Sequence, residues 1–499
     1  MPASAGHRFT VPLRQAVGWA RRRLLELVGG PARFQVIAIL AGVMALDAAD
    51  KGTIGAVAPE LKQSLGITNT QLGALTSVSS GVGALAAVPV GALTDRVNRS
   101  RLLAVSIVLW GAAMVAGALA GSFLWLLLSR LALGAVTATS GPPVASLIGD
   151  YFPPGERGRI YGFVLSGELL GAGLGLLVGG NLAPLLTWRA AFAVLAVLGL
   201  GLVYVIARRL PEPARGGQSR LRPGETRLGE RAGGGEEDAE QGPDQDDVAR
   251  SAVREHGVRP DPALVLRRDP EAMSLWAAAR YVLRIRTNVV LIVASALGYF
   301  FFAALRTFGV DFVMRRYGLG HVAVSGLAIL IGAGALAGVL TGGRVADRLI
   351  RRGHLGARVV VPAVAYLLAA GLFLPGLLTT AVVVALPAFL LAAGSLTAAN
   401  PPLDAARLDV IHFRLWGRAE AVRTVLRMGA EAVAPVTFGL LADVFGARAG
   451  NRAQGLMYAF LVMLVPLVAN AVILFRALPA YPRDVATAAE SEHRATRCR

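Results

Sequence analysis

The sequence predicts an all-α membrane protein with twelve transmembrane helices in two pseudo-symmetric six-helix bundles. Of the 499 residues, 55% are apolar and only 16% are charged, whereas a soluble domain carries roughly 25% charged residues. The apolar residues gather in stretches of about 20, the length that a helix needs to cross a bilayer core of about 30 Å. The two halves of the chain also repeat a short motif of glycine and charged residues. An ordinary soluble enzyme is therefore excluded.

We predict an N-terminal bundle at residues 33–208 and a C-terminal bundle at residues 287–478, each with six spans. The first six spans lie at about 34–58, 69–93, 102–121, 123–148, 159–181 and 189–208. The second six lie at about 288–313, 321–343, 358–377, 380–402, 419–442 and 454–477. Each span is a run of mostly apolar residues, and each boundary is set to within about four residues.

Three segments lie outside the bundles. Residues 1–32 are predicted as a cytoplasmic amphipathic segment, because the arginines at 14–23 lie opposite apolar residues, a pattern typical of a helix on the membrane surface. Residues 209–286 are predicted as a cytoplasmic linker, largely disordered, because a segment rich in Arg, Gly, Glu, Asp and Pro cannot build a core. Helical periodicity returns at 270–286. Residues 479–499 are predicted as a cytoplasmic tail.

The positive charges of the short loops predict the orientation in the membrane. Fourteen arginines lie in the loops after spans two, four, eight and ten, whereas six Lys and Arg residues lie on the opposite side. Because cytoplasmic loops carry the excess of Lys and Arg, both termini and the linker are predicted to be cytoplasmic. We expect a multi-pass protein of the inner (plasma) membrane.

The composition also excludes several kinds of chemistry. The net charge of +18 does not indicate a nucleic-acid partner, because the cations lie between apolar spans rather than in a patch with aromatic residues. Cys498 is the only cysteine, so no internal disulfide or cysteine-based metal site can form. The six histidines lack the spacing of metal ligands. We therefore predict neither a metal nor a cofactor.

Glycines repeat every four residues in the fifth span, at Gly167, Gly171, Gly175 and Gly179. They follow no predicted strand, so a dinucleotide-binding loop is excluded. Small residues at this spacing form a ridge along one helix face, which predicts close packing of a neighbouring helix.

The first span contains three ionisable residues, Asp47, Asp50 and Lys51. An ionisable side chain in the bilayer costs about 2.5–3.5 kcal/mol, so each one prompts a functional hypothesis. Arg130 in the fourth span and Arg306 in the seventh lie at a similar depth, which predicts a coupled Asp/Lys/Arg cluster that binds and releases a proton. In this hypothesis Asp50 meets Lys51 or Arg130. The alternative is a charge pair that only fixes helix packing.

Three further charges within the predicted spans are candidates for a functional role. Glu168, in the fifth span, has no cation within a turn on its own helix, so it is a second candidate for proton binding, either protonated or paired with Arg427. Arg427 and Glu431 are four residues apart in the eleventh span. They are either an ion pair within one helix or residues that bind the substrate head group or a proton.

The repeated motif carries a resemblance to a known family. It reads Gly91-x-x-x-Asp95-Arg96-x-x-Arg99 after the second span, and residues 343–351 repeat it after the eighth span with Asp347 and Arg348. This motif and Arg130-x-x-x-Gly134 resemble motifs of the major facilitator superfamily, over residues 33–478. The run Gly171–Gly180 resembles the glycine-rich motif of antiporters in that family.

Within the superfamily, the segments ADKGTIGAVAPEL, LIGDYFPPGERGR and GAGLGLLVGG most resemble the spinster-like branch, with a similarity to drug-efflux branches. Two residues depart from the pattern of the spinster-like branch. Lys51 stands where that branch usually has arginine, and Thr137 stands where it usually has glutamate.

The resemblance implies a secondary active transporter that works by alternating access. It implies proton-coupled export of an amphipathic organic or lipid-like molecule, with protons and membrane lipids as partners and a monomer as the default. It also implies that Gly91, Asp95, Arg96 and Arg99, with Asp347 and Arg348 in the second half, latch the cytoplasmic side. A multidrug efflux antiporter is the alternative, and a non-transporting receptor or a membrane-embedded enzyme is a further one.

Overall fold

The structure is a computed structural model of the chain, and it describes most of the 499 residues. The described residues are 28–94, 96–137, 141–152, 157–214, 248–266, 273–412 and 415–497, together with the single residues 25, 139 and 221. The predicted amphipathic helix at 11–28 and most of the predicted disordered part of the linker lie outside the described residues.

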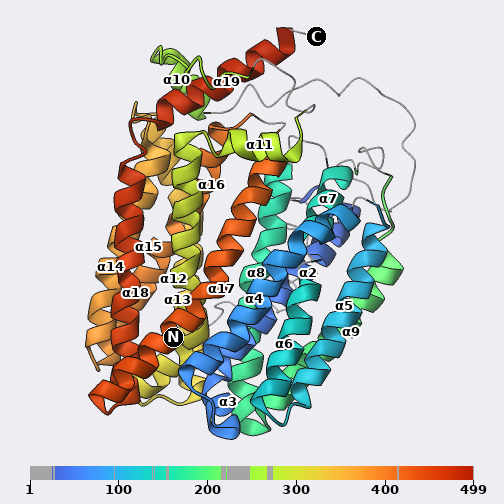
Figure 1. Cartoon of the computed structure of the whole chain (residues 1–499), viewed down its shortest axis with the longest axis vertical. Coiled ribbons are helices and arrows are strands. Elements are labelled where there is room, and N and C mark those ends of the chain that lie inside the picture. The colour runs from blue at the N-terminus through green and yellow to red at the C-terminus, as the bar shows by residue number, and fades with distance from the viewer. Residues whose placement is uncertain are drawn as a thin grey trace, which may run out of the picture.

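The described part of the chain folds into helices joined by turns (Figure 1). The N-terminal half contains α2 (Pro31–Ala56), α3 (Ala58–Leu65), α4 (Asn69–Thr94), α5 (Arg99–Ala118), α6 (Phe123–Thr137), α7 (Gly141–Tyr151), α8 (Arg157–Leu185) and α9 (Trp188–Arg209). The C-terminal half contains α12 (Arg286–Tyr317), α13 (His321–Ile350), α14 (Ala357–Leu378), α15 (Val382–Ala398), α16 (Asn400–Asp409), α17 (Trp416–Ala449) and α18 (Arg452–Phe475). Three helices lie outside the halves: α10 (Val248–Glu255), α11 (Leu275–Val282) and α19 (Tyr481–Arg497).

Eleven helical stretches of the described residues are long and apolar enough to cross a membrane. Two of them join a pair of helices, α6 with α7 and α15 with α16. The remaining predicted span coincides with α4, a helix of 26 residues that is rich in Ser, Thr and Gly. The structure therefore supports eleven crossings by length and composition, and the twelfth, through α4, stays a prediction.

The two halves repeat one packing scheme. In the N-terminal half α2 packs on α8, α4 on α6 and α5 on α9; in the C-terminal half α12 packs on α17, α13 on α15 and α14 on α18. These are the same pairs by order along each half. Between the halves, α4 packs on α17, α2 on α12 and α8 on α13, so the halves meet along the centre of the molecule (Figure 1).

The glycine ridge of α8 explains the closeness of α2 and α8. A Cβ atom on Gly167, Gly171 or Gly175 would overlap a backbone carbonyl oxygen of α2, at Ala41, Ala45 and Ala49 respectively. Hydrocarbon chains do not drive helices together, so small residues that allow backbones to touch provide the packing energy. The predicted ridge is confirmed. The C-terminal half uses the same device, where glycines at 334, 338 and 342 of α13 meet the backbone of α15.

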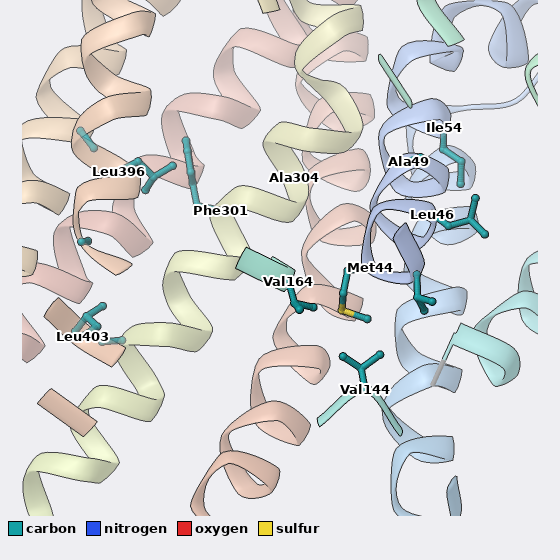
Figure 2. Close-up of a cluster of buried hydrophobic side chains, with 14 of the residues drawn as sticks. Met44, Leu46, Ala49, Ile54, Val144, Val164, Phe301, Ala304, Leu396 and Leu403 are labelled. Carbon is teal, nitrogen blue, oxygen red and sulfur yellow. The ribbon is translucent and has the colours of Figure 1, made fainter. Parts of the chain in front are cut away.

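Apolar side chains from both halves fill the interior. Figure 2 shows Leu46 and Ala49 of α2, Val164 of α8, and Phe301 and Ala304 of α12 in one buried cluster. Phe301 is packed against Phe373 of α14, with ring centroids 5.1 Å apart. This apolar frame holds the few charged side chains of the interior in fixed positions.

The two ends of the molecule differ in structure. One end carries the short helix α3; the other carries α7, α16 and the three helices outside the halves, with α11 lying across the helix ends (Figure 1). We call these the α3 end and the α10 end. Helicity in the predicted interfacial segment 270–286 is confirmed by α11.

The residues predicted as a tail include α19, which packs against α10 from the linker. The buried Arg250 of α10 pairs with Glu492 of α19, Nη1–Oε2 2.5 Å. The final part of the linker is therefore attached to the tail.

The glycine ridge can be tested by adding one methyl group. We expect Gly171→Ala to destabilise the protein by about 1–3 kcal/mol, since the added carbon overlaps the Ala45 carbonyl oxygen. Thermal unfolding in detergent measures this. The matched control is Gly173→Ala on the same helix, where the added carbon meets open space and the higher helix propensity of alanine predicts an unchanged or raised midpoint. Equal effects of the two substitutions would contradict the ridge.

Candidate functional site

The ionisable residues of α2 form two separate ion pairs. Arg130 of α6 donates from Nη1 to Oδ1 of Asp50 at 2.6 Å, and Lys51 donates from Nζ to Oδ2 of Asp47 at 2.6 Å. Residues four apart on a helix share a face, whereas consecutive residues point about 100° apart. Asp50 therefore faces away from Lys51, toward the interior of the N-terminal half.

The Asp50–Arg130 pair is almost completely buried. Asp50 is 3% exposed and Arg130 is 1% exposed. The guanidinium carbon of Arg130 lies 4.6 Å from the ring centroid of Phe192, and Nη2 lies 3.6 Å from the sulfur of Met114. Its Nε makes no hydrogen bond. An arginine held by one carboxylate among apolar groups is stable only while that carboxylate is ionised.

A second group of charges lies where the halves face each other. We call Asp47, Lys51, Glu168, Arg306, Arg427 and Glu431 the central charged cluster. Lys51 interacts electrostatically with Arg306 and Glu431 of the other half. Glu168, an exposed residue of α8, interacts in the same way with Arg427. The predicted residues of both halves are thus brought together around one region.

The C-terminal side of this cluster combines cations with aromatic rings. The guanidinium carbon of Arg427 lies 4.5 Å from the ring centroid of Tyr299, and that of Arg306 lies 5.8 Å from the ring centroid of Phe302. Nε of Arg427 lies 3.9 Å from Glu431 and makes no hydrogen bond. Arg427 therefore retains a buried donor that a polar group of a substrate can satisfy.

Thr137 is the last residue of α6. Its hydroxyl donates to the carbonyl oxygen of Gly134 at 3.1 Å. Thr137, Asp47 and Trp110 line a small cavity within the N-terminal half. Oδ1 of Asp47 and Nε1 of Trp110 have no hydrogen-bond partner, so this cavity has both a free acceptor and a free donor on its lining residues.

Polar contacts join the two halves at the α3 end. Asp443 of α17 accepts hydrogen bonds from the backbone N–H groups of Asn69 and Thr70, at 3.2 and 2.8 Å, and from both side chains. Asn69 begins α4, and the positive end of a helix dipole favours an anion. Lys62 of α3 donates to Asp311 of α12 at 2.5 Å. We call these contacts the α3-end junction.

At the α10 end, ion pairs join helices within each half instead. Arg99 is buried and binds Asp150 at the end of α7, Oγ of Ser146 at 2.8 Å and Oε1 of Glu212 at 2.7 Å. Burial alone would raise the pKa of Glu212, but hydrogen bonds from the Ser100 N–H and from Arg99 hold that pKa below its usual value. Arg99 thus fastens three segments of the N-terminal half.

Arg358 occupies the matching place in the C-terminal half. At the start of α14 it donates to Asp409 at 2.5 Å and to Asp347 at 3.0 Å. Asp409 also accepts a hydrogen bond from the hydroxyl of Tyr481, after α18. The network repeats that of Arg99, with α16 in place of α7.

The other predicted latch residues lie as follows. Gly91 lies within the last turns of α4, and Arg96 is an exposed residue of the turn after it. Arg348 is also exposed, at the end of α13. Asp95 lies outside the described residues, so its predicted latch contact stays a prediction.

Sequence reasoning did not single out Asp150, Glu212, Asp409 or Tyr481. One sequence signal was available, because a Leu-Pro dipeptide follows the last span of each half, at 210–211 and at 478–479. Glu212 comes directly after the first of these prolines, and Tyr481 comes two residues after the second. Aligning the halves as a repeat along their whole length would have found these partners. Among the described residues, no group of three or more His, Cys, Asp or Glu side chains is placed to hold a metal ion.

Comparison with known proteins agrees with this architecture. Residues 40–419 match the sequence profile of the Major Facilitator Superfamily. The chain is similar to a 4-hydroxybenzoate transporter of Pseudomonas aeruginosa, with 28% identity over 37% of this chain and 41% of that protein. It is similar to the protein spinster of Drosophila melanogaster, with 27% identity over 38% of this chain and 31% of that protein.

A puromycin resistance protein of Streptomyces alboniger is 31% identical over 38% of each chain. Each of these three matches spans less than half of the relative's own length. Among solved structures, a bacterial homologue of the human lysosomal transporter spinster, in an inward-facing and occupied conformation, superposes with a TM-score of 0.70. It is 20% identical, and the match covers 91% of this chain and 98% of that one. A D-xylose–proton symporter superposes with a TM-score of 0.64 at 16% identity, over 90% of this chain and 99% of that one.

The interdependence of Asp50 and Arg130 can be measured by a double-mutant cycle. We expect Arg130→Gln alone to lower stability by about 3–5 kcal/mol, because it leaves a buried carboxylate without its cation. In the double variant Asp50→Asn/Arg130→Gln, two neutral amides can bond to each other, so part of this loss is regained. Thermal unfolding of the four proteins gives the coupling energy. Additive losses would show that the two side chains do not stabilise each other.

The Glu212 contact predicts a dependence of stability on pH. Since its pKa is lowered in the folded protein, Glu212 stabilises the fold above the pKa of an unfolded glutamate, about 4.3, and this contribution is lost as the pH falls through the lowered value. We expect Glu212→Gln to cost about 1.5–3 kcal/mol at neutral pH, and the difference from the parent protein to shrink below about pH 4. Thermal unfolding of both proteins between pH 3 and 7 measures this difference in stability. A difference in stability that is constant over this pH range would contradict the role of ionised Glu212 in stabilising the fold.

Proposed function

Because the chain belongs to the Major Facilitator Superfamily, whose members are membrane transporters for small molecules, we propose that it exports an amphipathic organic or lipid-like molecule in exchange for protons by alternating access. One observation carries this proposal. Asp50, which is almost completely buried against Arg130 of α6, lies on α2, the helix that also bears the Asp47–Lys51 pair of the central charged cluster. A site for a proton and a site for a substrate are therefore linked through one rigid helix.

Asp50 is the proposed proton site. A carboxylate loses its affinity for protons beside a cation and gains affinity on desolvation. Small movements of α6 against α2 change both effects, because Arg130 is the cation and the apolar surroundings provide the desolvation. Protonation of Asp50 in turn leaves Arg130 without a counter-charge and so favours a different arrangement of these helices. Glu168 is the second proposed proton site, through its interaction with Arg427.

The substrate is proposed to bind at the central charged cluster. Lys51, Arg306 and Arg427 supply cations from both halves, and Asp47, Glu168 and Glu431 supply carboxylates. Aromatic rings at Tyr299 and Phe302 lie beside the arginines. A molecule with an apolar body and a charged or zwitterionic head satisfies both kinds of group.

The positive-inside pattern favours a cytoplasmic α10 end in the inner membrane, with both termini on that side. In that orientation the α3-end junction is the closed outer side. The ion pairs of Arg99 and Arg358 then keep the cytoplasmic end of each half rigid while the halves rock. We propose a monomer as the working unit.

A multidrug efflux antiporter is the second candidate. The 31% identity to a puromycin resistance protein favours it, and so does the mixed charge of the central cluster, which suits cationic as well as anionic compounds. The two candidates share a mechanism and differ in substrate.

Reconstituted vesicles with an imposed pH gradient test the proposal. The probes are a lysophospholipid, 4-hydroxybenzoate and puromycin, and an enclosed pH-sensitive dye reports proton movement. We expect at least one probe to move against its gradient with counter-flow of protons, and Asp50→Asn to reduce this coupled flux at least about tenfold. The matched control Asp261→Asn changes a carboxylate outside both bundles and should transport normally.

Three results would count against the proposal. Undiminished coupling in Asp50→Asn would remove Asp50 as the proton site. Flux that is independent of the pH gradient would remove proton coupling. Binding of a probe, measured by thermal stabilisation, without any flux would indicate a receptor.

A further inference from the structure

A carboxylate and an imidazole from opposite halves meet at the α3 end. Nε2 of His321, the first residue of α13, lies 2.6 Å from Oε1 of Glu60 on α3. The side chains are only 15% and 19% exposed. The contact joins the N-terminal half to the C-terminal half, so it must separate when the halves part at this end.

Both side chains also have an atom without a partner. Nδ1 of His321 and Oε2 of Glu60 are buried and make no hydrogen bond within the described residues. His321 lines a small cavity with Ala56, Gly180 and Ser325, which come from three different helices. A proton between the two facing atoms, Nε2 of His321 and Oε1 of Glu60, therefore decides the strength of this contact.

The charged groups around the pair belong to the α3-end junction. Asp311 of α12 interacts electrostatically with Glu60. Asp311 is in turn bound by Lys62 at 2.5 Å and by Arg315 at 2.7 Å. Lys62 and Arg315 thus both bind Asp311, and the imidazole of His321 is the group that pairs with Glu60.

We propose that Glu60 and His321 form a proton-binding site that is completed when the two halves close at the α3 end. In the closed junction the pair holds a proton between a partly buried carboxylate and an imidazole. In the open arrangement the two side chains are apart and solvated. Imidazole side chains in general gain and lose their proton between about pH 5 and 8.

The direction of the effect follows from linkage. Burial raises the pKa of Glu60, although a backbone hydrogen bond and His321 act to lower it. A closed junction therefore binds a proton more tightly than the separated side chains do, and the state that binds protons more tightly is favoured by acid. Low pH on this side is expected to close the junction, and high pH to loosen it by removing the proton that the pair shares.

This inference rests on the proposed function for its role in the cycle. An exporter driven by an inward proton gradient must link proton binding from outside to closure of the outer side. A site that is completed only on closure provides that link at the junction itself, where Glu60 follows the proposed proton site Asp50 by ten residues in the chain. It makes the return of the empty, protonated transporter faster at acidic external pH.

Distance measurements by pulsed electron paramagnetic resonance test the site without substrate or gradient. Cys498 is first replaced by serine, and spin labels are attached to Gln63→Cys on α3 and Val322→Cys on α13, which are both exposed. In the parent protein we expect the population with the shorter distance to be about fivefold larger at pH 5.5 than at pH 8.5, as expected for one linked proton. His321→Gln and Glu60→Gln should each reduce this ratio to below about 1.5-fold.

Two controls make the result decisive. His354→Gln removes an exposed histidine at the α10 end and should keep the full pH response. Thermal unfolding of each variant establishes that it is folded. A pH-independent distance in the parent protein, or an unchanged pH response in both His321→Gln and Glu60→Gln, would overturn the proposal. Because no transport is measured, failure of the proposed function would leave this result unaffected, and the reverse also holds.

Discussion

The cost of an unpaired charge in hydrocarbon governs where this protein keeps its ionisable side chains. Asp50 and Arg130 are buried together, and Asp47 and Lys51 pair along one helix. Within each pair, each side chain removes most of the free-energy cost of burying the charge of its partner. The same constraint means that a change of protonation alters the stability of the present arrangement, since neutralising one partner leaves the charge of the other in an unfavourable environment.

The charge pairs fall into two groups that differ in what they join. Arg99 and Arg358 fasten segments within a half, at the α10 end. Lys62 with Asp311, and Glu60 with His321, join one half to the other at the α3 end. Pairs within a half stay intact during rigid-body motion, whereas pairs between halves are made and broken. The proposed cycle depends on that difference.

Close backbone packing makes each half rigid enough to move as one body. The glycines of α8 bring that helix into backbone contact with α2, and the glycines of α13 bring that helix into backbone contact with α15. Such contacts lose about a quarter to a half of their dispersion energy if the helices separate by about 0.5–1 Å. Most of the motion must therefore occur between the halves, along α4–α17, α2–α12 and α8–α13. These are the surfaces that carry the central charged cluster and the α3-end junction.

The sequence by itself determined the class of fold, because length and hydropathy fix the spans and a repeated motif reveals two halves. It also determined the close contact made by Gly167, Gly171 and Gly175, since helical spacing alone places them on one face. The i,i+4 pairs Asp47–Lys51 and Arg427–Glu431 follow from the same local geometry. Only the tertiary structure decided that Asp50 binds Arg130, that Arg99 binds Glu212 and that Glu60 meets His321. Those partners are 80, 113 and 261 residues apart in the chain. Helical periodicity relates only residues a few positions apart, so the packing of whole helices is what brings these partners together.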